Sequence, residues 1–208
     1  SGYGREIMPL ARLQLHSSGV PLDRLVFIDD QPQLGIINHH RVCTWSKFLE
    51  IPACRREVVL AIANSQVREL LAKRLQEASV NGWSVTASNA MLMDDIVMAE
   101  GACLSAFVLL TSSIRIVSYF QANAYSYVGH DCVIGDFVTF APRVSCNGNV
   151  IIEDHAYIGT GAILKQGTPD KPLVIGRGAV IGMGAVVTKS VPPGVTVVGN
   201  PARPLVKS

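Results

Sequence analysis

A histidine stands directly before an aspartate at His130 and Asp131, in the segment Val-Gly-His-Asp. Histidine is the side chain that changes charge near neutral pH, so it can take a proton from a reacting group. A carboxylate can orient the imidazole, and Asp131 and Asp136 are both candidates. Adjacent strand residues point to opposite faces, so contact between His130 and Asp131 requires a turn or a neighbouring subunit. The pair predicts a general base; the alternative is an ordinary surface histidine beside a solvated acid.

An apolar residue recurs at every sixth position through the second half of the chain, and this repeat must position the histidine. The positions are Met98, Leu104, Leu110, Ile116, Ala122, Val128, Ile134, Phe140, Cys146, Ile152, Ile158 and Leu164. A six-residue period fits neither an α-helix nor a single strand, and it is typical of a parallel β-helix of hexapeptides. The period slips over residues 165–174, where prolines, a glycine and an aspartate predict a loop thrown out of one coil.

Residues 1–90 carry different patterns, which predict a small parallel α/β sheet. The predicted helices cover residues 5–17 and 65–78, and the predicted strands cover residues 24–30, 57–63 and 83–87. Alternation of strands and helices indicates a parallel sheet. The second helix is expected to be capped by Ser65 and to bury Val67, Leu70, Leu71 and Leu75. The joint near residues 88–95 gives domains of residues 1–90 and 91–208.

The chain opens with Ser-Gly-Tyr-Gly directly before the first predicted helix. A glycine turn that leads into a helix is the second half of a strand–loop–helix unit. We expect the native protein to have a strand ahead of Ser1, because the helix needs a sheet on which to pack. The alternative is an unstructured start. No complete dinucleotide fingerprint is present, so the domain does not indicate NAD.

Charge and hydropathy exclude several functional classes. The formal net charge is +2, and the basic residues are scattered, so the nucleic-acid-binding class is excluded. No apolar run reaches the roughly 18–20 residues of a membrane span, and no signal peptide is visible. The five cysteines lack metal-ligand spacing, and the histidines supply no third ligand. These features predict a cytoplasmic protein with reduced cysteines and no metal.

Several segments together resemble the hexapeptide-repeat acyltransferases. They are the hexads, the Gly-His-Asp-Cys-Val-Ile-Gly-Asp-Phe of residues 129–137 and the Val-Gly-Asn-Pro-Ala-Arg of residues 198–203. The opening Ser-Gly-Tyr-Gly-Arg-Glu and the Phe-Ile-Asp-Asp of residues 27–30 resemble one branch of this family. That branch contains sialic acid O-acetyltransferases and N-acetyltransferases of nucleotide-linked 4-amino sugars. The resemblance implies a left-handed β-helix of triangular section behind a Rossmann-like domain, three hexads per turn, and a homotrimer with active sites between neighbouring β-helices.

The resemblance also assigns roles to residues. His130 would be the base, Asp131 its orienting acid, and the Gly148 N–H the donor to the acetyl carbonyl. His130 and Gly148 are 18 positions apart, or three hexads, so we expect them on the same edge of successive coils. Thr139 departs from the pattern, because some relatives have a second histidine there. The expected acetyl-CoA-binding residues are Gly148, Thr160, Gly161, Gly182, Met183, Gly184 and Arg203. The expected substrate-binding residues are Gly2, Tyr3, Gly4, Asp29, Asp30, Ala63 and Asn64.

These residues lead to one main functional hypothesis. The protein is expected to use acetyl-CoA to N-acetylate a nucleotide-linked 4-amino-4,6-dideoxy sugar for surface-polysaccharide or glycan synthesis. An O-acetyltransferase acting on sialic acid or a related sugar is the enzymatic alternative. A non-catalytic hexapeptide-repeat scaffold is the alternative of another class.

Overall fold

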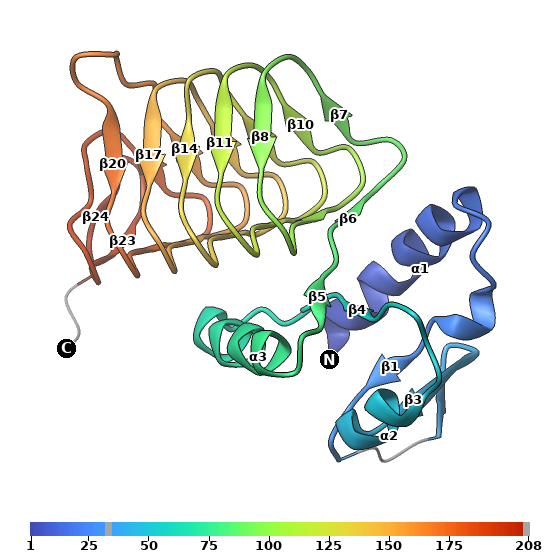
Figure 1. Cartoon of the computed structure of the whole chain (residues 1–208). Helices are drawn as coiled ribbons and strands as arrows, with labels where there is room; N and C mark the ends of the chain where they lie inside the picture. Colours follow the sequence, from blue (N-terminus) through green and yellow to red (C-terminus); the bar gives the residue numbers. More distant parts are fainter. Residues whose placement is uncertain (32–34, 206–208) are drawn as a thin grey trace.

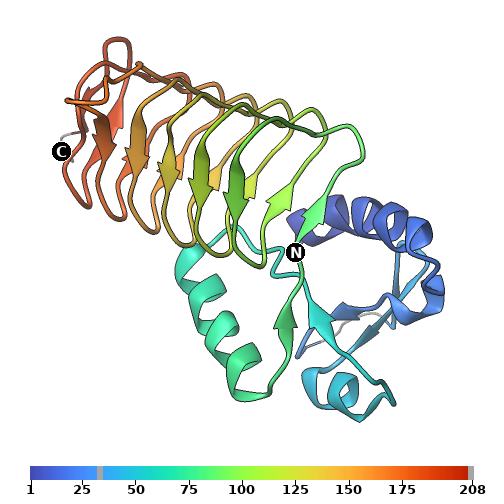
Figure 2. The same cartoon turned by 45° about the horizontal axis from the view of Figure 1, so that its top comes forward.

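The computed structural model describes residues 1–31 and 35–205 of the chain. It has two parts, a coil of short parallel strands and a smaller α/β part packed against the first turns of that coil (Figure 1). Figure 2 shows α1 (Gly2–Ser17) and α3 (Ser65–Glu77) beside the N-terminal end of the coil. The α/β part therefore covers only some of the coil surface.

Three sheets form the sides of the coil, and each regular turn contributes one strand to each sheet. The strands are parallel except for β24, which pairs antiparallel to β23. The six-stranded sheet contains β7 (Met91–Leu92), β10 (Leu109–Leu110), β13 (Tyr127–Val128), β16 (Ser145–Cys146), β19 (Ile163–Leu164) and β22 (Val186–Val187). The five-stranded sheet contains β8 (Ile96–Met98), β11 (Ile114–Ile116), β14 (Val133–Ile134), β17 (Val150–Ile152) and β20 (Leu173–Ile175). The eight-stranded sheet contains β6 (Val85–Thr86), β9 (Cys103–Leu104), β12 (Gln121–Ala122), β15 (Thr139–Phe140), β18 (Tyr157–Ile158), β21 (Val180–Ile181), β23 (Thr196–Val198) and β24 (Arg203–Pro204).

The register confirms the predicted coil. Leu110 pairs with Val128, Val128 with Cys146, and Cys146 with Leu164, so each step along the sheet is 18 residues. The next step, from Leu164 to Val187, is 23 residues, and the additional residues form the predicted loop. Every predicted ladder position from Leu104 to Leu164 is buried in one continuous apolar core. Burial of this ladder is what fixes the orientation of the turns between the strands.

The α/β part differs from the predicted small parallel sheet. It contains β1 (Phe27–Ile28), β2 (Ile36–Ile37), β3 (His40–Cys43), α2 (Trp45–Glu50), β4 (Glu57–Val58) and β5 (Asn81–Gly82), besides α1, α3 and the short 3-10 helix Leu22–Arg24. The strands form two separate sheets, β1-β3-β2 and β4-β5. β1 runs parallel to β3 and β4 parallel to β5, but β2 pairs antiparallel to β3. The prediction of an all-parallel sheet was therefore wrong at β2, which forms a tight hairpin with β3.

Two further details correct the sequence reading. The strand predicted at residues 83–87 is β6, which pairs with β9 in the coil rather than with the α/β part. The predicted helix at residues 65–78 is present as α3, but its cap is Asn64, whose Oδ1 accepts hydrogen bonds from Gln66 N and Val67 N. Asn64 is an effective cap because its side chain satisfies two of the unpaired amides at the helix start.

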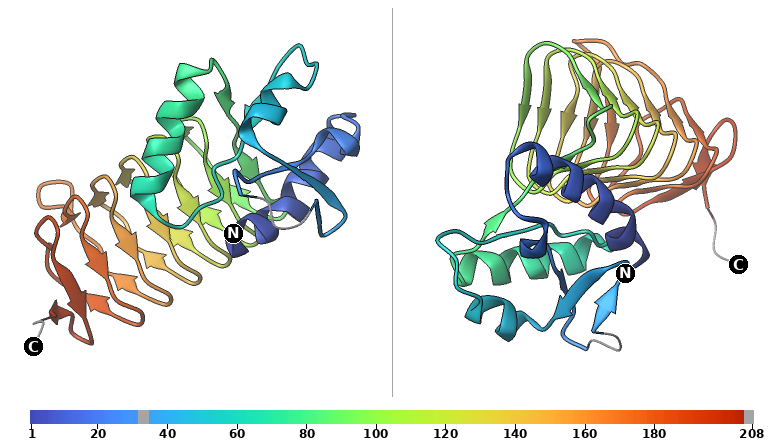
Figure 3. Two further views of the ribbon diagram at one scale, coloured as in Figure 1. Left: turned by 90° about the horizontal axis from the view of Figure 1, so that it is seen from below. Right: turned by 90° about the vertical axis from the view of Figure 1, so that its right-hand side faces the viewer.

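Arg68 joins the two parts of the molecule. It projects from α3 and is fully buried. Its guanidinium donates to the carbonyl oxygens of Ile62, Ala63 and Phe137, and to Gln121 Oε1 and Thr139 Oγ1 at 3.0 and 2.9 Å. Figure 3 shows α3 and α1 along the side of the coil. Gln121 and Thr139 belong to the eight-stranded sheet, so this is the face that the α/β part covers.

Candidate active site

His130 lies in the turn that leads from β13 in the six-stranded sheet to β14 in the five-stranded sheet. We call the column of such turns the histidine corner; it includes residues 129–132 and 147–149. His130 Nδ1 lies 2.7 Å from Asp131 Oδ2, and both side chains are about half exposed. The left-handed backbone of Asp131, with φ 58°, allows this contact between adjacent residues. Asp131 therefore holds one ring nitrogen, Nδ1, and leaves Nε2 without a hydrogen-bond partner among the described residues.

Asp136 does not contact the imidazole. It lies at a different corner, between β14 and β15, and its Oδ1 accepts a hydrogen bond from Ser118 N at 2.9 Å. Of the two carboxylates considered from the sequence, Asp131 is therefore the one that orients His130.

Gly148 lies directly against the imidazole, on the next turn of the same corner. A Cβ at residue 148 would lie 2.5 Å from His130 Nε2, so a side chain there would displace the ring. The backbones are also joined, because Asn149 N donates to the carbonyl oxygen of His130 at 2.9 Å. The expectation that His130 and Gly148 share one edge of successive coils is confirmed.

The amide of Gly148 has no acceptor within the described part of the chain. Both Gly148 and Gly129 are buried, and a Cβ at residue 129 would lie 2.6 Å from Gly148 N. A buried backbone N–H without a partner is uncommon and is often completed by a ligand. Its position beside Nε2 suits a donor to a carbonyl oxygen on which negative charge develops.

The residues expected to bind acetyl-CoA lie mainly at a second corner, between the eight-stranded and six-stranded sheets. Thr160, Gly161, Gly182, Met183 and Gly184 form turns there, and Gly184 N donates to the carbonyl oxygen of Thr160 at 2.8 Å. We call this column the glycine corner. Met183 is 81% exposed, while Arg203 lies in β24 of the eight-stranded sheet. The six-stranded sheet separates these residues from His130 within one chain.

The residues expected to bind the sugar nucleotide lie in the α/β part, and several are already engaged. The Gly4 amide donates to Ser1 Oγ at 3.0 Å, and the Ala63 carbonyl accepts from Arg68. Asn64 caps α3. The Tyr3 hydroxyl is buried without a hydrogen-bond partner among the described residues, and burial raises the pKa of Tyr3 well above its ordinary value. The Gly2 and Tyr3 amides at the α1 N-terminus remain available to an anion.

The two aspartates of this set differ in their surroundings. Asp30 accepts hydrogen bonds from Arg74 at 2.7 Å and from Trp45 N at 3.1 Å, and these bonds lower the pKa of Asp30. Its carboxylate is thus used within the fold. Asp29 is exposed, and among the described residues its carboxylate accepts only from Gln31 N, at 3.0 Å through Oδ1.

Sequence reasoning missed the role of Arg68. The buried face of α3 contains Arg68 and Leu75, with Leu71 and Ala72 packed beside them, whereas Val67 and Leu70 are exposed. The spacing 68, 71, 72 and 75 is that of one helix face, but an arginine at its first position obscured the pattern. The Thr139 hydroxyl accepts a hydrogen bond from Arg68 at 2.9 Å and is buried between the α/β part and the coil.

No cluster of three or more histidine, cysteine, aspartate or glutamate side chains suits a metal ion in residues 1–31 and 35–205. Within the same ranges, no helix has the length and apolar character needed to cross a membrane.

Comparison with known proteins identifies relatives over the whole length. No family model matches the chain. The chain is 45% identical over 206 residues to GDP-perosamine N-acetyltransferase of Escherichia coli O157:H7, covering 99% of this chain and 93% of the relative. It is similar to the structure of WeeI from Acinetobacter baumannii AYE, with 54% identity, 99% and 96% coverage and a TM-score of 0.95. The acetyltransferase domain of PglB from Neisseria gonorrhoeae FA1090, solved with acetyl coenzyme A, matches at 25% identity, 99% and 95% coverage and a TM-score of 0.85.

The first two matches exceed what a shared fold alone would give, and they extend through both the α/β part and the coil. The histidine corner, with an oriented imidazole beside an unpaired amide, is consistent with acyl transfer. The chain belongs to the hexapeptide-repeat acetyltransferases, in the branch of the nucleotide-amino-sugar N-acetyltransferases.

Proposed function

We propose that the protein transfers the acetyl group of acetyl-CoA to the 4-amino group of a GDP-linked 4-amino-4,6-dideoxy sugar, with GDP-perosamine as the first substrate to test. The observation that carries this proposal is the 45% identity to a GDP-perosamine N-acetyltransferase over 99% of the chain. The product would enter surface-polysaccharide or glycan synthesis. The reaction would take place in the cytoplasm.

In the proposed reaction His130 acts as the general base. Nδ1 is held by Asp131, so Nε2 accepts the proton that the sugar amine loses as its nitrogen attacks the acetyl carbon. The N–C bond forms and the C–S bond breaks. The proton on the imidazole then passes to the departing CoA thiolate, which restores the neutral base. The Gly148 N–H donates to the acetyl oxygen while negative charge develops there.

The proposed active site requires more than one chain. His130 lies at the histidine corner, the proposed CoA residues lie at the glycine corner, and the proposed nucleotide residues lie against the eight-stranded sheet. We propose a homotrimer of left-handed coils in which the histidine corner of one chain faces the glycine corner of its neighbour. Coenzyme A would lie in the groove between them, with Arg203 near its phosphates and Gly2, Tyr3 and Asp29 holding the sugar nucleotide.

The surface of the six-stranded sheet supports this arrangement. The sheet lies between the two corners, so in such a trimer it faces the threefold axis. Its outward side chains are mostly apolar, and each is partly or fully exposed on the single chain. They are Met91, Leu109, Tyr127, Ser145, Ile163 and Val186. A contiguous apolar face on a single chain is typical of an interface.

The function is tested by following CoA thiol release with acetyl-CoA and a panel of acceptors. The panel contains GDP-, UDP- and dTDP-linked 4-amino sugars and sialic acid, with the 4-hydroxy sugar nucleotides as matched controls. We expect release with GDP-perosamine and none with its 4-hydroxy counterpart. Release only with sialic acid would instead support an O-acetyltransferase, and no release with any acceptor would favour a scaffold.

A further inference from the structure

Three planar side chains form a column on the glycine corner. They are Phe107, Tyr125 and Arg143, each at the left-handed position of its turn, with φ of 61°, 63° and 60°. The Phe107 and Tyr125 rings are stacked with their centroids 4.8 Å apart, and the Arg143 guanidinium lies 5.7 Å from the centroid of the Tyr125 ring. Further along the coil, Gly161 and Gly184 occupy the same position. We call Phe107, Tyr125 and Arg143 the aromatic column.

The aromatic column is exposed, unlike a similar stack at another corner. Tyr119, Phe137 and His155 take the same left-handed position between the five-stranded and eight-stranded sheets, with ring centroids 5.3 and 5.2 Å apart. There Tyr119 and Phe137 pack in one apolar cluster with residues of α3. Phe107 and Tyr125 are instead 53% and 55% exposed. Two adjacent exposed rings are typical of a surface that binds something.

The register of the coil determines what faces the column in the proposed trimer. One turn of 18 residues rises about 4.8 Å, so residues five apart differ in height by about 1 Å. His130 comes five residues after Tyr125, and Gly148 comes five residues after Arg143. Both lie at the histidine corner, which faces the glycine corner of the neighbouring chain when the threefold axis runs along the coil. The neighbour's His130 would therefore lie opposite Tyr125, and its Gly148 opposite Arg143.

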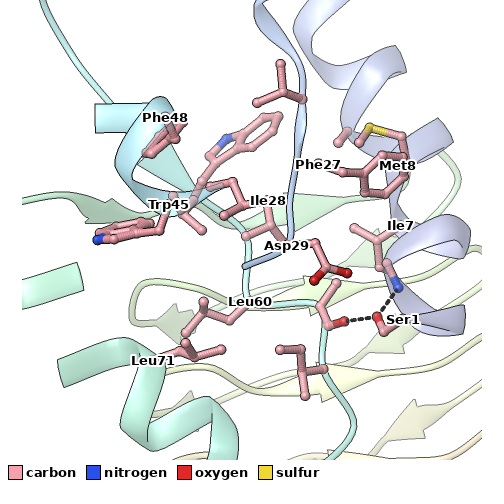
Figure 4. A pocket seen from close by; sticks show the side chains of 18 of the residues that line it. Ser1, Ile7, Met8, Phe27, Ile28, Asp29, Trp45, Phe48, Leu60 and Leu71 are labelled. Atoms are coloured by element: carbon pink, nitrogen blue, oxygen red, sulfur yellow. Dashed lines mark hydrogen bonds between the residues drawn. The ribbon is translucent and has the colours of Figure 1, made fainter. Parts of the chain in front are cut away.

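The proposed acceptor reaches this place from the Phe107 end of the column. Tyr3 of α1 packs in one apolar cluster with Cys103 of β9, the strand that leads into the turn of Phe107. Asp29 and Ser1 line the same pocket, and Figure 4 shows Asp29 on the side where α1 begins. The start of α1, where an anion can bind, is therefore near Phe107. The proposed CoA residues lie beyond the other end, so the column spans the gap between nucleotide and thioester.

We propose that Phe107 and Tyr125 are the surface on which the sugar ring of the acceptor lies, and that they select a methyl group rather than a hydroxymethyl group at C6. This inference rests on the proposed function and its trimer. Phe107 and Arg143 cover the two faces of the Tyr125 ring, so the column presents mainly hydrocarbon edges to the groove. A C6 methyl group lies favourably there, whereas a C6 hydroxyl group would lose hydrogen bonds to water. The neighbour's Ser112, five residues after Phe107, faces the hydroxyl-bearing edge of the sugar.

Steady-state kinetics with two acceptors test the proposal. The acceptors are the GDP-linked 4-amino-4,6-dideoxy sugar and the same compound with a hydroxyl group at C6. The original chain is expected to favour the first by about tenfold or more in kcat/KM, the lower range for a hydrophobic pocket. With Phe107→Ala and Tyr125→Ala combined, the KM for the dideoxy sugar should rise about tenfold and the preference should disappear. The KM for acetyl-CoA should stay the same.

Two further variants are controls for this double variant. Tyr125→Phe keeps the stacked ring, so it should keep both the KM and the preference. Tyr157→Ala removes a tyrosine that is 39% exposed on the eight-stranded sheet, and it should change neither. The melting temperature and the oligomeric state are measured for every variant, because a column that only joins subunits would change these instead.

Refolding the double variant with His130→Ala in equal amounts shows which chain supplies the column. About one quarter of the interfaces then combine an intact column with an intact His130 of the neighbour. Activity at low acceptor concentration should return to about one quarter of the original value. If the column served the His130 of its own chain, no site would be intact, and activity would stay below that of the double variant.

Three results would overturn the proposal. They are an unchanged acceptor KM and preference in the double variant, an equal rise in both KM values with dissociation of the trimer, and no gain of activity on mixing. In each of these the original chain still turns over its acceptor, so the proposed function stands. Absence of turnover by the original chain with every acceptor would overturn the proposed function together with this inference.

Discussion

At the scale of single residues, the contact between His130 and Asp131 depends on backbone conformation. In a regular strand the two side chains would point in opposite directions. Asp131 instead adopts a positive φ of 58° in the turn, and its carboxylate reaches His130 Nδ1 at 2.7 Å. The six-residue period predicted that His130 lies in a turn of the coil. The sequence alone left open whether Asp131 or Asp136 contacts its imidazole.

Replacing His130 tests its role as the base. His130→Ala is expected to lower kcat by about 10²–10⁴-fold, the usual contribution of a general base. The melting temperature and the oligomeric state should stay unchanged, because the side chain is half exposed. Steady-state kinetics with saturating acetyl-CoA measure the effect. His16→Ala, at an exposed helix end, is the control. Turnover near that of the original protein would remove His130 from the mechanism.

Gly148 permits a test that changes geometry rather than charge. Gly148→Ala places a Cβ 2.5 Å from the present position of His130 Nε2, so the imidazole must move. We expect kcat to fall about 10²-fold or more, because displacement of a catalytic group by an ångström has an effect of this size. Gly35→Ala is the matched control, since a Cβ there meets nothing within 4 Å and Gly35 has no proposed role in the site. Equal activity of the two variants would contradict the packing of base against glycine.

At the scale of elements, α3 is held to the coil by one buried cation. Arg68 has six oxygen acceptors from the loop before α3 and from two turns of the coil, and no carboxylate among the described residues forms an ion pair with it. Burial lowers the pKa of Arg68 to about 10, so it remains charged at neutral pH. Its acceptors are therefore bound by a charged donor, which makes stronger bonds than a neutral one.

Arg68→Met is expected to destabilise the protein by about 2–4 kcal/mol, because buried carbonyl and amide oxygens lose their donor. The melting temperature should fall by roughly 5–15 °C. Thermal unfolding followed by circular dichroism measures this. Arg74→Met is the control, because its ion pair with Asp30 is half exposed and such pairs contribute little. A change no larger than that of the control would mean that apolar contacts alone hold α3 in place.

The elements also show what the sequence can and cannot determine. The ladder from Leu104 to Leu164 was predictable because every turn of the coil must bury an apolar side chain at the same position. The α/β part was less predictable, because its strands are short and their partners are set by contacts distant in the chain. The sequence of residues 83–87 predicts a strand, but it does not show whether that strand belongs to the α/β part or to the coil. The pairing of β6 with β9 assigns it to the coil. Arg68 was missed because a buried arginine interrupts an otherwise apolar helix face.

At the scale of the whole molecule, the coil distributes the proposed functional groups over its corners. His130 and Gly148 share the histidine corner, while Gly161 and Gly184 share the glycine corner across the six-stranded sheet. A rigid coil cannot bring two of its own corners together. The proposed site therefore combines the histidine corner of one chain with the glycine corner of another, as in the proposed cyclic trimer.

Subunit mixing tests this arrangement directly. His130→Ala removes the base, and Met183→Glu places a negative charge at the glycine corner on a side chain that is 81% exposed, where it repels the phosphates of CoA without disturbing the fold. Each variant alone should be nearly inactive. If the variants are unfolded together and refolded in equal amounts, about one quarter of the interfaces pair an intact histidine corner with an intact glycine corner. Activity should then return to about one quarter of the original value, because each heterologous interface of a cyclic trimer forms one site. Activity that stays at the level of the separate variants would mean that each chain builds its site alone.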